Sequence, residues 1–217
     1  MESLIKDIIS SPKLSLYHKE IENIITEENK KRKKFYEEMK EGDKVEFING
    51  EIFFNSPVKL EHNQCQKLLL NLLDNFVRVN KLGYVGNEKI MISLTRNDYE
   101  PDICFFNKLI SNNFNPKQMQ FPAPDFIVEV VSPSTENNDR IIKFEDYAAH
   151  GIKEYWIVEP EKKIIEQYVL DKEKYDLFIK SDNGLIKSKA IPGFEIPIEA
   201  VFNEEENLKV LKNIIIK

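Results

Sequence analysis

The chain has 217 residues, of which 41% are hydrophobic and 31% are charged, and its formal net charge is −6. That length is enough for one sizeable hydrophobic core, so we expect one main domain with extensions rather than two full domains. The acidic balance, with a pI near 5.3, argues against a surface that coats nucleic acid without selectivity, although it is compatible with an enzyme that has a local basic groove.

Nothing in the sequence indicates a membrane or secreted protein. The longest apolar runs, such as residues 67–73, are far shorter than the roughly 20 residues that span a bilayer. The N-terminus lacks the basic-then-apolar order of a secretory signal. The two cysteines, Cys65 and Cys104, have no CxxC spacing, which argues against a disulfide framework and a thiolate zinc site. We therefore expect a soluble, cytoplasmic protein without membrane contacts.

The N-terminal region is expected to be helical over residues 1–40, because apolar residues recur there at helical intervals and no glycine occurs before Gly42. Residues 30–34 form the one dense basic block. We interpret it as a solvated helix face beside acidic neighbours rather than as a nucleic-acid contact. We predict a helical extension over residues 1–40, a main domain over residues 41–203, and a C-terminal helix or tail over residues 204–217.

The main domain begins with a predicted hairpin over about residues 45–54, since its Asn49-Gly50 turn contains two residues that tolerate positive φ. A helix with a buried leucine stripe is expected from about residue 62 to residue 80, and Gly83 is its natural stop. The remaining pattern predicts strands at about residues 84–94, 99–106, 125–131, 153–158, 163–170, 174–180 and 185–190, and helices at about residues 139–150 and 204–214.

This order of elements predicts an α/β (α+β) domain in which a central mixed sheet is flanked by helices. The strand at 125–131, the helix at 139–150 and the strand at 153–158 form a β-α-β crossover, so we expect these two strands to be parallel. On the crossover helix, the helical period predicts that Ile141, Phe144 and Ala148 face the core.

Two of the apolar strands each carry a carboxylate for which a strand has little structural use. Asp102 lies at the head of the strand at 99–106, and Glu129 has apolar neighbours on both sides. An unpaired buried carboxylate costs several kcal/mol, so such a group is normally paired, hydrogen-bonded or bound to a cation. Hydrogen bonds to nearby serine and threonine hydroxyls are one explanation for Glu129. We favour a site, because two carboxylates that converge beside a lysine suit a divalent metal for phosphodiester hydrolysis.

These carboxylates lie within a longer pattern that resembles a known family. Glu100-Pro101-Asp102, residues 123–135, Asp139 with Lys143, and residues 147–160 are similar to the Uma-type family of restriction endonucleases, which belongs to the PD-(D/E)XK nuclease superfamily. The similarity covers about residues 43–202. It implies a restriction endonuclease-like fold, DNA as the substrate, and hydrolysis of phosphodiester bonds assisted by Mg²⁺ (or Mn²⁺). Exposed strand edges and amphipathic helices at both ends suggest a homodimer, and so does the resemblance, because such nucleases cut both strands.

The resemblance implies roles for individual residues. By position, Asp102 and Glu129 correspond to the metal-binding carboxylates, and the carbonyl of Val130 is a further candidate ligand because hard cations accept backbone oxygen. The superfamily lysine normally lies two residues after the second carboxylate, where this chain has Val131. The resemblance suggests that Lys143 replaces it from the following helix. The alternative is a surface lysine that pairs with Asp139 at i, i+4 spacing.

Other residues give weaker signals. Glu51, directly after the hairpin turn, is either a further acidic catalytic residue or an exposed turn residue. The histidines at positions 18, 62 and 150 have no metal-ligand spacing, and His62 is expected to begin its helix near the mouth of the site.

Two other classes of function compete with a nuclease. A nuclease-like fold that no longer cuts and acts as a binding or assembly module is favoured by the acidic pI and by Val131 at the usual lysine position. A sugar hydrolase would need Asp102 and Glu129 about 5–10 Å apart in an open cleft. Trp156, the one tryptophan, lies in an apolar strand and offers no sugar platform. Nucleotide hydrolysis is not indicated either, because there is no Gly-rich phosphate loop.

Overall fold

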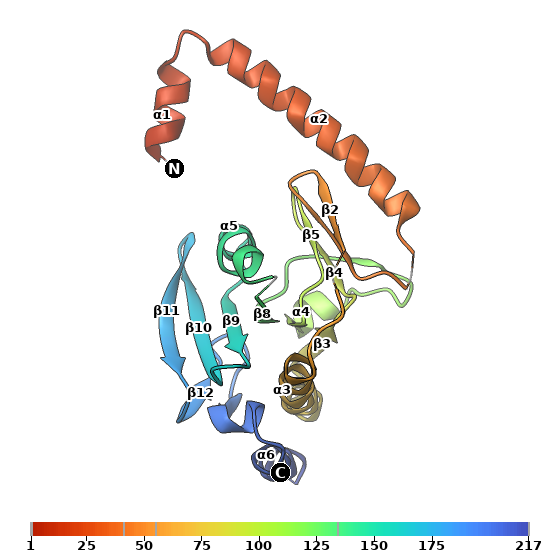
Figure 1. Cartoon of the computed structure of the whole chain (residues 1–217), viewed down its shortest axis with the longest axis vertical. Coiled ribbons are helices and arrows are strands. Elements are labelled where there is room, and N and C mark those ends of the chain that lie inside the picture. Colours follow the sequence, from red (N-terminus) through yellow and green to blue (C-terminus); the bar gives the residue numbers. More distant parts are fainter. Residues whose placement is uncertain (1, 41, 55, 134, 217) are drawn as a thin grey trace. The chain divides into compact units, whose positions relative to one another are not determined.

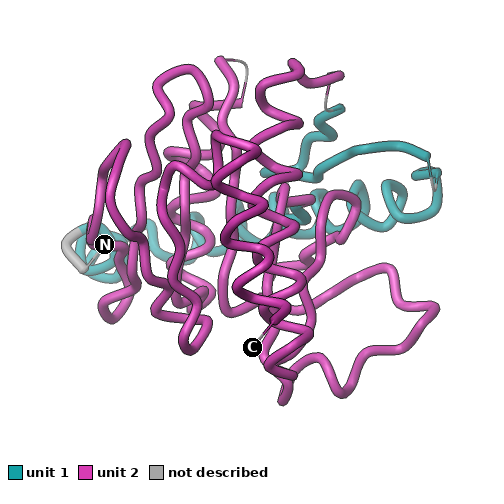
Figure 2. The backbone as a smooth tube through the Cα atoms, turned by 90° about the horizontal axis from the view of Figure 1, so that it is seen from below, with its two compact units in different colours: residues 1–55, 96–99 teal, residues 56–95, 100–217 magenta. Residues whose placement is uncertain are grey.

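A computed structural model describes residues 2–40, 42–54, 56–133 and 135–216. The chain divides into two compact units, which Figure 2 distinguishes in teal and magenta. The first contains residues 1–55 and 96–99, and the second contains residues 56–95 and 100–217. The domain boundaries expected after residues 40 and 203 stay predictions.

The first unit is helical at its start, as predicted, and then forms a small antiparallel sheet. Its elements are α1 (Glu2–Ser10), α2 (Leu14–Glu38), β1 (Val45–Ile48), β2 (Glu51–Phe54) and β5 (Asp98–Tyr99). The predicted hairpin is confirmed: β1 pairs with β2, and the turn residues Asn49 and Gly50 have φ values of 52° and 83°. On its other side β1 pairs with β5, where Phe47 lies opposite Asp98.

The basic block of α2 is only partly a solvated helix face. Lys30 and Lys34 pair on the surface with Glu27 and Glu38, as expected. Arg32 instead turns inward, and its Nε and Nη2 donate to the two carboxylate oxygens of Asp98 at 2.6 Å and 2.8 Å. The Asp98 side chain is fully buried, so this pair joins α2 to β5 inside the unit.

The second unit contains the remaining elements of the chain, and Figure 1 shows their arrangement. Its helices are α3 (Leu60–Asn80), α4 (Lys108–Ser111), the π-helical turn η1 (Asn138–Ile142), α5 (Lys143–Ala149), the 3₁₀ turn η2 (Ile198–Val201) and α6 (Glu204–Ile215). Its strands are β3 (Gly83–Asn87), β4 (Met91–Ser93), β6 (Ile103–Asn107), β7 (Gln120–Phe121), β8 (Phe126–Val130), β9 (Glu154–Glu159), β10 (Ile164–Asp171), β11 (Lys174–Ser181), β12 (Leu185–Lys187) and β13 (Glu195–Pro197).

A six-stranded mixed sheet forms the centre of this unit, in the order β11-β10-β9-β8-β6-β3. The predicted crossover is confirmed, because β8 and β9 are parallel and η1 and α5 connect them. The other neighbouring pairs are antiparallel. The structure therefore confirms a mixed sheet flanked by helices.

Helix α3 covers the face of the sheet that holds the main core. Leu69, Leu72, Leu73 and Val77 are fully buried and recur at helical spacing, so they form one apolar stripe. They pack with the apolar side chains of β6, β8 and β9. Helix α6 lies beside α3, as Figure 1 shows in the lower part of the unit.

Gly83 has a different role from the helix stop that the sequence suggested. Helix α3 ends at Asn80, and Lys81 adopts the left-handed conformation with φ 54°. Gly83 begins β3, where a Cβ would collide with the backbone oxygen of Phe106 on the neighbouring strand. A close approach between strands, rather than the end of the helix, therefore requires glycine at this position.

Several short elements were not predicted. The expected strand at 84–94 is two strands, β3 and β4, and the loop between β6 and β8 contains α4 and the short strand β7, which pairs in parallel with β4. Within the described parts of the chain, no helix combines the length and the apolar character needed to cross a membrane.

Candidate functional site

Glu129 lies in strand β8, and Asp102 immediately precedes β6, the antiparallel neighbour of β8 in the central sheet. Strand β6 pairs with β8 so that Ile103 lies opposite Val128. If this register is continued by one residue, position 102 lies opposite position 129. Side chains of directly opposed residues project from the same face of a sheet with their Cβ atoms about 4.5–5.5 Å apart. Both carboxylates are buried, with exposed fractions of 5% for Asp102 and 3% for Glu129.

The environment of Asp102 consists of backbone and helix α3. The amide nitrogen of Val130, the last residue of β8, donates to Asp102 Oδ2 at 2.8 Å. The Nε2 of His62 lies 3.4 Å from the same oxygen. The backbone oxygen of Asp102 accepts from Gln66 Nε2 at 3.1 Å and from the amide of Glu88 at 3.2 Å. These contacts hold residue 102 at the head of β6 from several directions.

Glu129 lies at the centre of a second buried cluster. Its Oε1 accepts hydrogen bonds from Lys143 Nζ and from the hydroxyl of Tyr147, each at 3.0 Å. The same ammonium lies 3.0 Å from Asp139 Oδ1. All three charged side chains are nearly inaccessible, so Lys143 bridges two buried carboxylates. The alternative of a surface lysine is wrong, although its i, i+4 partner Asp139 is the one expected.

A π-helical turn brings these residues onto one side. Residues 138–142 form η1, and α5 continues from Lys143. A π-turn holds one more residue than an α-turn, so it shifts the following side chains around the helix axis. The buried positions of η1 and α5 are Asp139, Lys143, Tyr147 and Ala148, so the prediction that Ala148 faces the core is confirmed. The prediction that Ile141 faces the core is wrong, because this side chain is 52% exposed.

Burial and the negative charges of Asp139 and Glu129 act together on the pKa of a neighbouring tyrosine, Tyr155. Tyr155 on β9 is fully buried, and its hydroxyl donates to the backbone oxygen of Asp139 at 3.1 Å. Burial raises the pKa of Tyr155 well above its ordinary value, and the negative charges of Asp139 and Glu129 act in the same direction. The site therefore combines low solvent access with concentrated negative charge.

A small pocket of about 100 Å³ opens beside this region, at the carboxyl ends of β8 and β9. Ligands of α/β proteins commonly bind at the carboxyl ends of parallel strands. The pocket is lined by Lys59, Glu61, His62, Val131, Ser132, Pro133, Glu136, Glu159, Pro160, Glu161 and Lys162. His62 belongs both to this lining and to the surroundings of Asp102, and its place near the mouth of the site stays a prediction.

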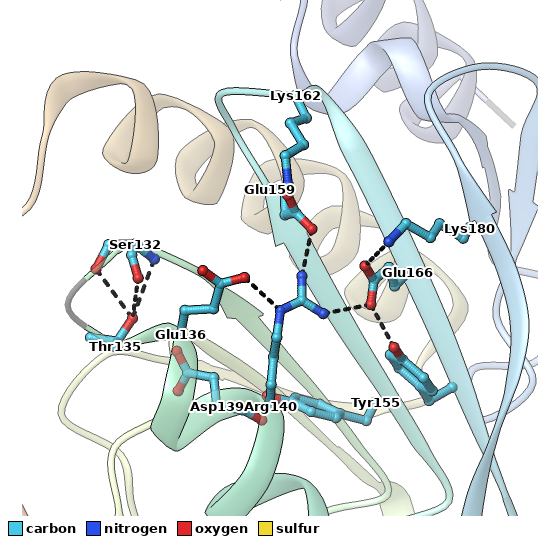
Figure 3. A network of polar contacts seen from close by, with 11 residues as sticks. Ser132, Thr135, Glu136, Asp139, Arg140, Tyr155, Glu159, Lys162, Glu166 and Lys180 are labelled. Carbon is cyan, nitrogen blue, oxygen red and sulfur yellow. Dashed lines mark hydrogen bonds and ion pairs between the residues drawn. The ribbon is translucent and has the colours of Figure 1, made fainter.

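An ion-pair network that sequence reasoning missed borders the pocket (Figure 3). Arg140 of η1 donates to Glu136 at 2.8 Å, to Glu166 at 2.8 Å and to Glu159 at 2.5 Å. Lys180 also contacts Glu166, at 2.8 Å. Because Glu159 lies on β9 and Glu166 on β10, Arg140 ties the π-turn to two strands of the sheet.

The pKa of Glu166 reflects this network. Burial alone would raise the pKa of this carboxyl, but hydrogen bonds from Arg140, Lys180 and Tyr168 outweigh burial and lower the pKa to about 2. The i, i+4 spacing of Glu136 and Arg140 is visible in the sequence, whereas the contacts with β9 and β10 depend on the tertiary fold.

The two remaining predicted site residues are Val130 and Glu51. Val130 ends β8 and touches Asp102 through its amide nitrogen. Glu51 belongs to the first unit, where it is exposed and lies 3.2 Å from Lys31 Nζ. Its catalytic role stays a prediction.

The oxygen atoms of Asp102, Glu129 and the Val130 carbonyl suit a hard divalent cation, because Mg²⁺ accepts carboxylate and backbone carbonyl oxygens as ligands. Across the described residues, no three His, Cys, Asp or Glu side chains are grouped so that they could hold a metal ion. A site here would therefore use the two carboxylates of Asp102 and Glu129 with backbone oxygen and water, as Mg²⁺ sites often do.

Comparison with known proteins supports the fold described above. The family model Uma2, described as "Putative restriction endonuclease", matches residues 33–199. The crystal structure of a "putative nuclease belonging to DUF820" from Anabaena variabilis ATCC 29413 is similar, with a TM-score of 0.66 and 16% identity over 82% of this chain and 96% of that chain. No curated protein matches the chain. The match to the family model over most of the sequence shows that the chain belongs to the Uma2 family of restriction endonuclease-like proteins.

Proposed function

We propose that this protein is a metal-dependent endonuclease that hydrolyses phosphodiester bonds in DNA. The observation that supports this most strongly is that Asp102, at the start of β6, lies next to Glu129 of the adjacent strand β8, with a buried lysine bonded to Glu129. The family match points to the same reaction class. In this proposal Asp102, Glu129 and the carbonyl of Val130 hold Mg²⁺ or Mn²⁺.

The chain's own residues have distinct tasks in this reaction. When bound, the cation polarises the phosphate and lowers the pKa of a coordinated water. Asp102, just before β6, and Glu129, on the neighbouring strand β8, would hold the cation through their buried carboxylates. Lys143 holds Glu129 and keeps a positive charge next to the place where negative charge develops on the phosphate. Asp139 and Tyr147 orient Lys143 and Glu129 in turn.

Cleavage of supercoiled plasmid with Mg²⁺ or Mn²⁺, and with EDTA, tests the proposal. We expect cleavage by the wild type that EDTA abolishes. Removing a metal carboxylate by Asp102→Asn or Glu129→Gln should lower the rate by about 10²-fold or more, and Lys143→Ala by about 10²–10³-fold. Glu145→Gln, on the exposed side of α5, is the matched control and should cut like the wild type.

The outcome also separates roles within the site. If Lys143→Ala cuts as fast as the wild type, the assignment of the lysine is wrong. If the wild type does not cut in either metal, or if Asp102→Asn keeps full activity, the proposed hydrolysis is refuted.

A second candidate function is a nuclease-like fold that binds a partner without cutting. The pocket beside the site favours it, because four glutamates and two lysines line that pocket, an unfavourable balance for a polyanion. Titration with Mn²⁺ by calorimetry distinguishes the two: a retained metal site binds Mn²⁺, whereas a site that has lost its function gives no heat of binding. Homodimerisation stays part of the proposal and is tested by sedimentation.

A further inference from the structure

Helix α3 contacts residue 102 at two points. His62 and Gln66 are four residues apart in the first turns of α3, so they project from the same side of the helix. The His62 ring approaches the carboxylate, with Nε2 3.4 Å from Oδ2. The Gln66 amide donates to the backbone oxygen of the same residue at 3.1 Å. One helix therefore contacts both the side chain and the main chain of Asp102.

Both contacts are buried. The exposed fractions are 6% for His62 and 4% for Gln66. The ring Nδ1 of His62 is itself buried and has no hydrogen-bond partner among the residues that the structure describes. Burying an imidazole with one unpartnered nitrogen costs free energy, and the contact that the other nitrogen makes with Asp102 offsets part of this cost. With hydrogen on Nε2, the ring donates toward Asp102 and Nδ1 is left as an acceptor.

Residue 102 needs such support because it precedes β6 rather than lying within it. Strand β6 begins at Ile103, so the ladder with β8 does not itself fix the Asp102 side chain. The amide of Val130 holds Oδ2 from one side, and His62 reaches the same oxygen from α3. Both contacts converge on one oxygen of the carboxylate and so restrict its rotation, a role that partners of metal-binding carboxylates commonly have.

We propose that His62 and Gln66 are positioning residues that hold Asp102 in the orientation in which it binds the metal. This inference rests on the proposed metal site. His62 is assigned to orientation rather than to coordination, because the described His, Cys, Asp and Glu side chains include no group of three that could hold a metal. Sequence spacing gave no sign of this role, since His62 is 40 residues from Asp102 along the chain.

Isothermal titration with Mn²⁺ tests the inference without DNA and without turnover. Loss of an outer partner of a metal ligand typically lowers metal affinity by about 10–100-fold. We expect that loss for His62→Ala. His62→Gln should restore most of the affinity, because the glutamine amide nitrogen can occupy the place of the imidazole Nε2 and donate to Asp102. Gln66→Ala should weaken binding in the same direction.

Two controls make the result specific. His18→Ala removes an exposed histidine from another helix and should bind Mn²⁺ like the wild type. Asp102→Ala should abolish binding, which identifies the site being titrated. Circular dichroism of each variant establishes that it is folded, and Gln66→Ala is the deciding variant if His62→Ala is unfolded.

The outcomes separate this inference from the proposed function. Wild-type affinity in His62→Ala, or in Gln66→Ala when the former is unfolded, together with loss of binding in Asp102→Ala, overturns the positioning role and leaves the metal site intact. Equal weakening in His62→Ala and His62→Gln also overturns it, because a donor at the Nε2 position would then have no effect. Wild-type binding in Asp102→Ala overturns both the metal site and the role of its supports.

Discussion

Replacing Lys143 by methionine leaves Glu129 and Asp139 buried without the cation that bridges them. The ammonium lies 3.0 Å from an oxygen of each carboxylate, and all three side chains are almost fully buried. Removing one partner from a buried ion pair typically costs about 3–5 kcal/mol, because a charge remains in a poorly solvated place. Two carboxylates share this lysine, so we expect a loss of unfolding free energy within that range for Lys143→Met.

Urea unfolding at pH 7 in the presence of EDTA, followed by circular dichroism, measures this loss. The matched control is Lys209→Met, which removes an exposed lysine paired with Glu206 on α6. Such surface pairs contribute about 0–1 kcal/mol. The double variant Glu129→Gln, Lys143→Met should lose less than the sum of the single variants, since one unpaired charge has been removed with its partner. A loss below about 1 kcal/mol for Lys143→Met would refute the buried bridge.

Three further predictions concern the second unit. The folded protein lowers the pKa of Glu166 to about 2, so the stability that this carboxylate contributes is complete above its unfolded pKa and is lost as the pH falls toward 2. The free energy of unfolding, measured in urea at several pH values, should therefore fall over this range. Glu166→Gln should make the free energy of unfolding less dependent on pH there. Burial raises the pKa of Cys65 to about 11 and that of Cys104 further, so a thiol reagent at pH 8 should label neither in the native protein and both in urea. Glu154 accepts hydrogen bonds from five donors, and thermal or urea unfolding of Glu154→Gln should show a loss of roughly 1–3 kcal/mol for each donor left unpaired.

Much of the second unit could be predicted from local pattern. Strand β8 is a run of apolar and β-prone residues bounded by Asp125 and by Ser132-Pro133, and α3 carries an unambiguous leucine stripe. The crossover between β8 and β9 follows from the order of elements. The sequence alone indicates that Glu129 belongs to a site, because a charged side chain in an apolar strand must have a partner.

The remaining features depend on information that is not local. The opposition of positions 102 and 129 requires the register of two strands separated by a long loop, and register is set by the assembled sheet. The π-turn before α5 is a change in backbone hydrogen bonding that helical periodicity does not reveal, which is why Ile141 was expected on the wrong side. Arg140 resembles an ordinary surface residue until the fold brings Glu159 and Glu166 to it.

A crystal grown with Mn²⁺ tests whether Asp102 and Glu129 share one divalent cation. We expect an anomalous difference peak about 2.0–2.6 Å from a carboxylate oxygen of each residue. A peak that contacts other side chains only, or no peak between these two carboxylates in a crystal with Mn²⁺ in large excess, would refute the shared cation.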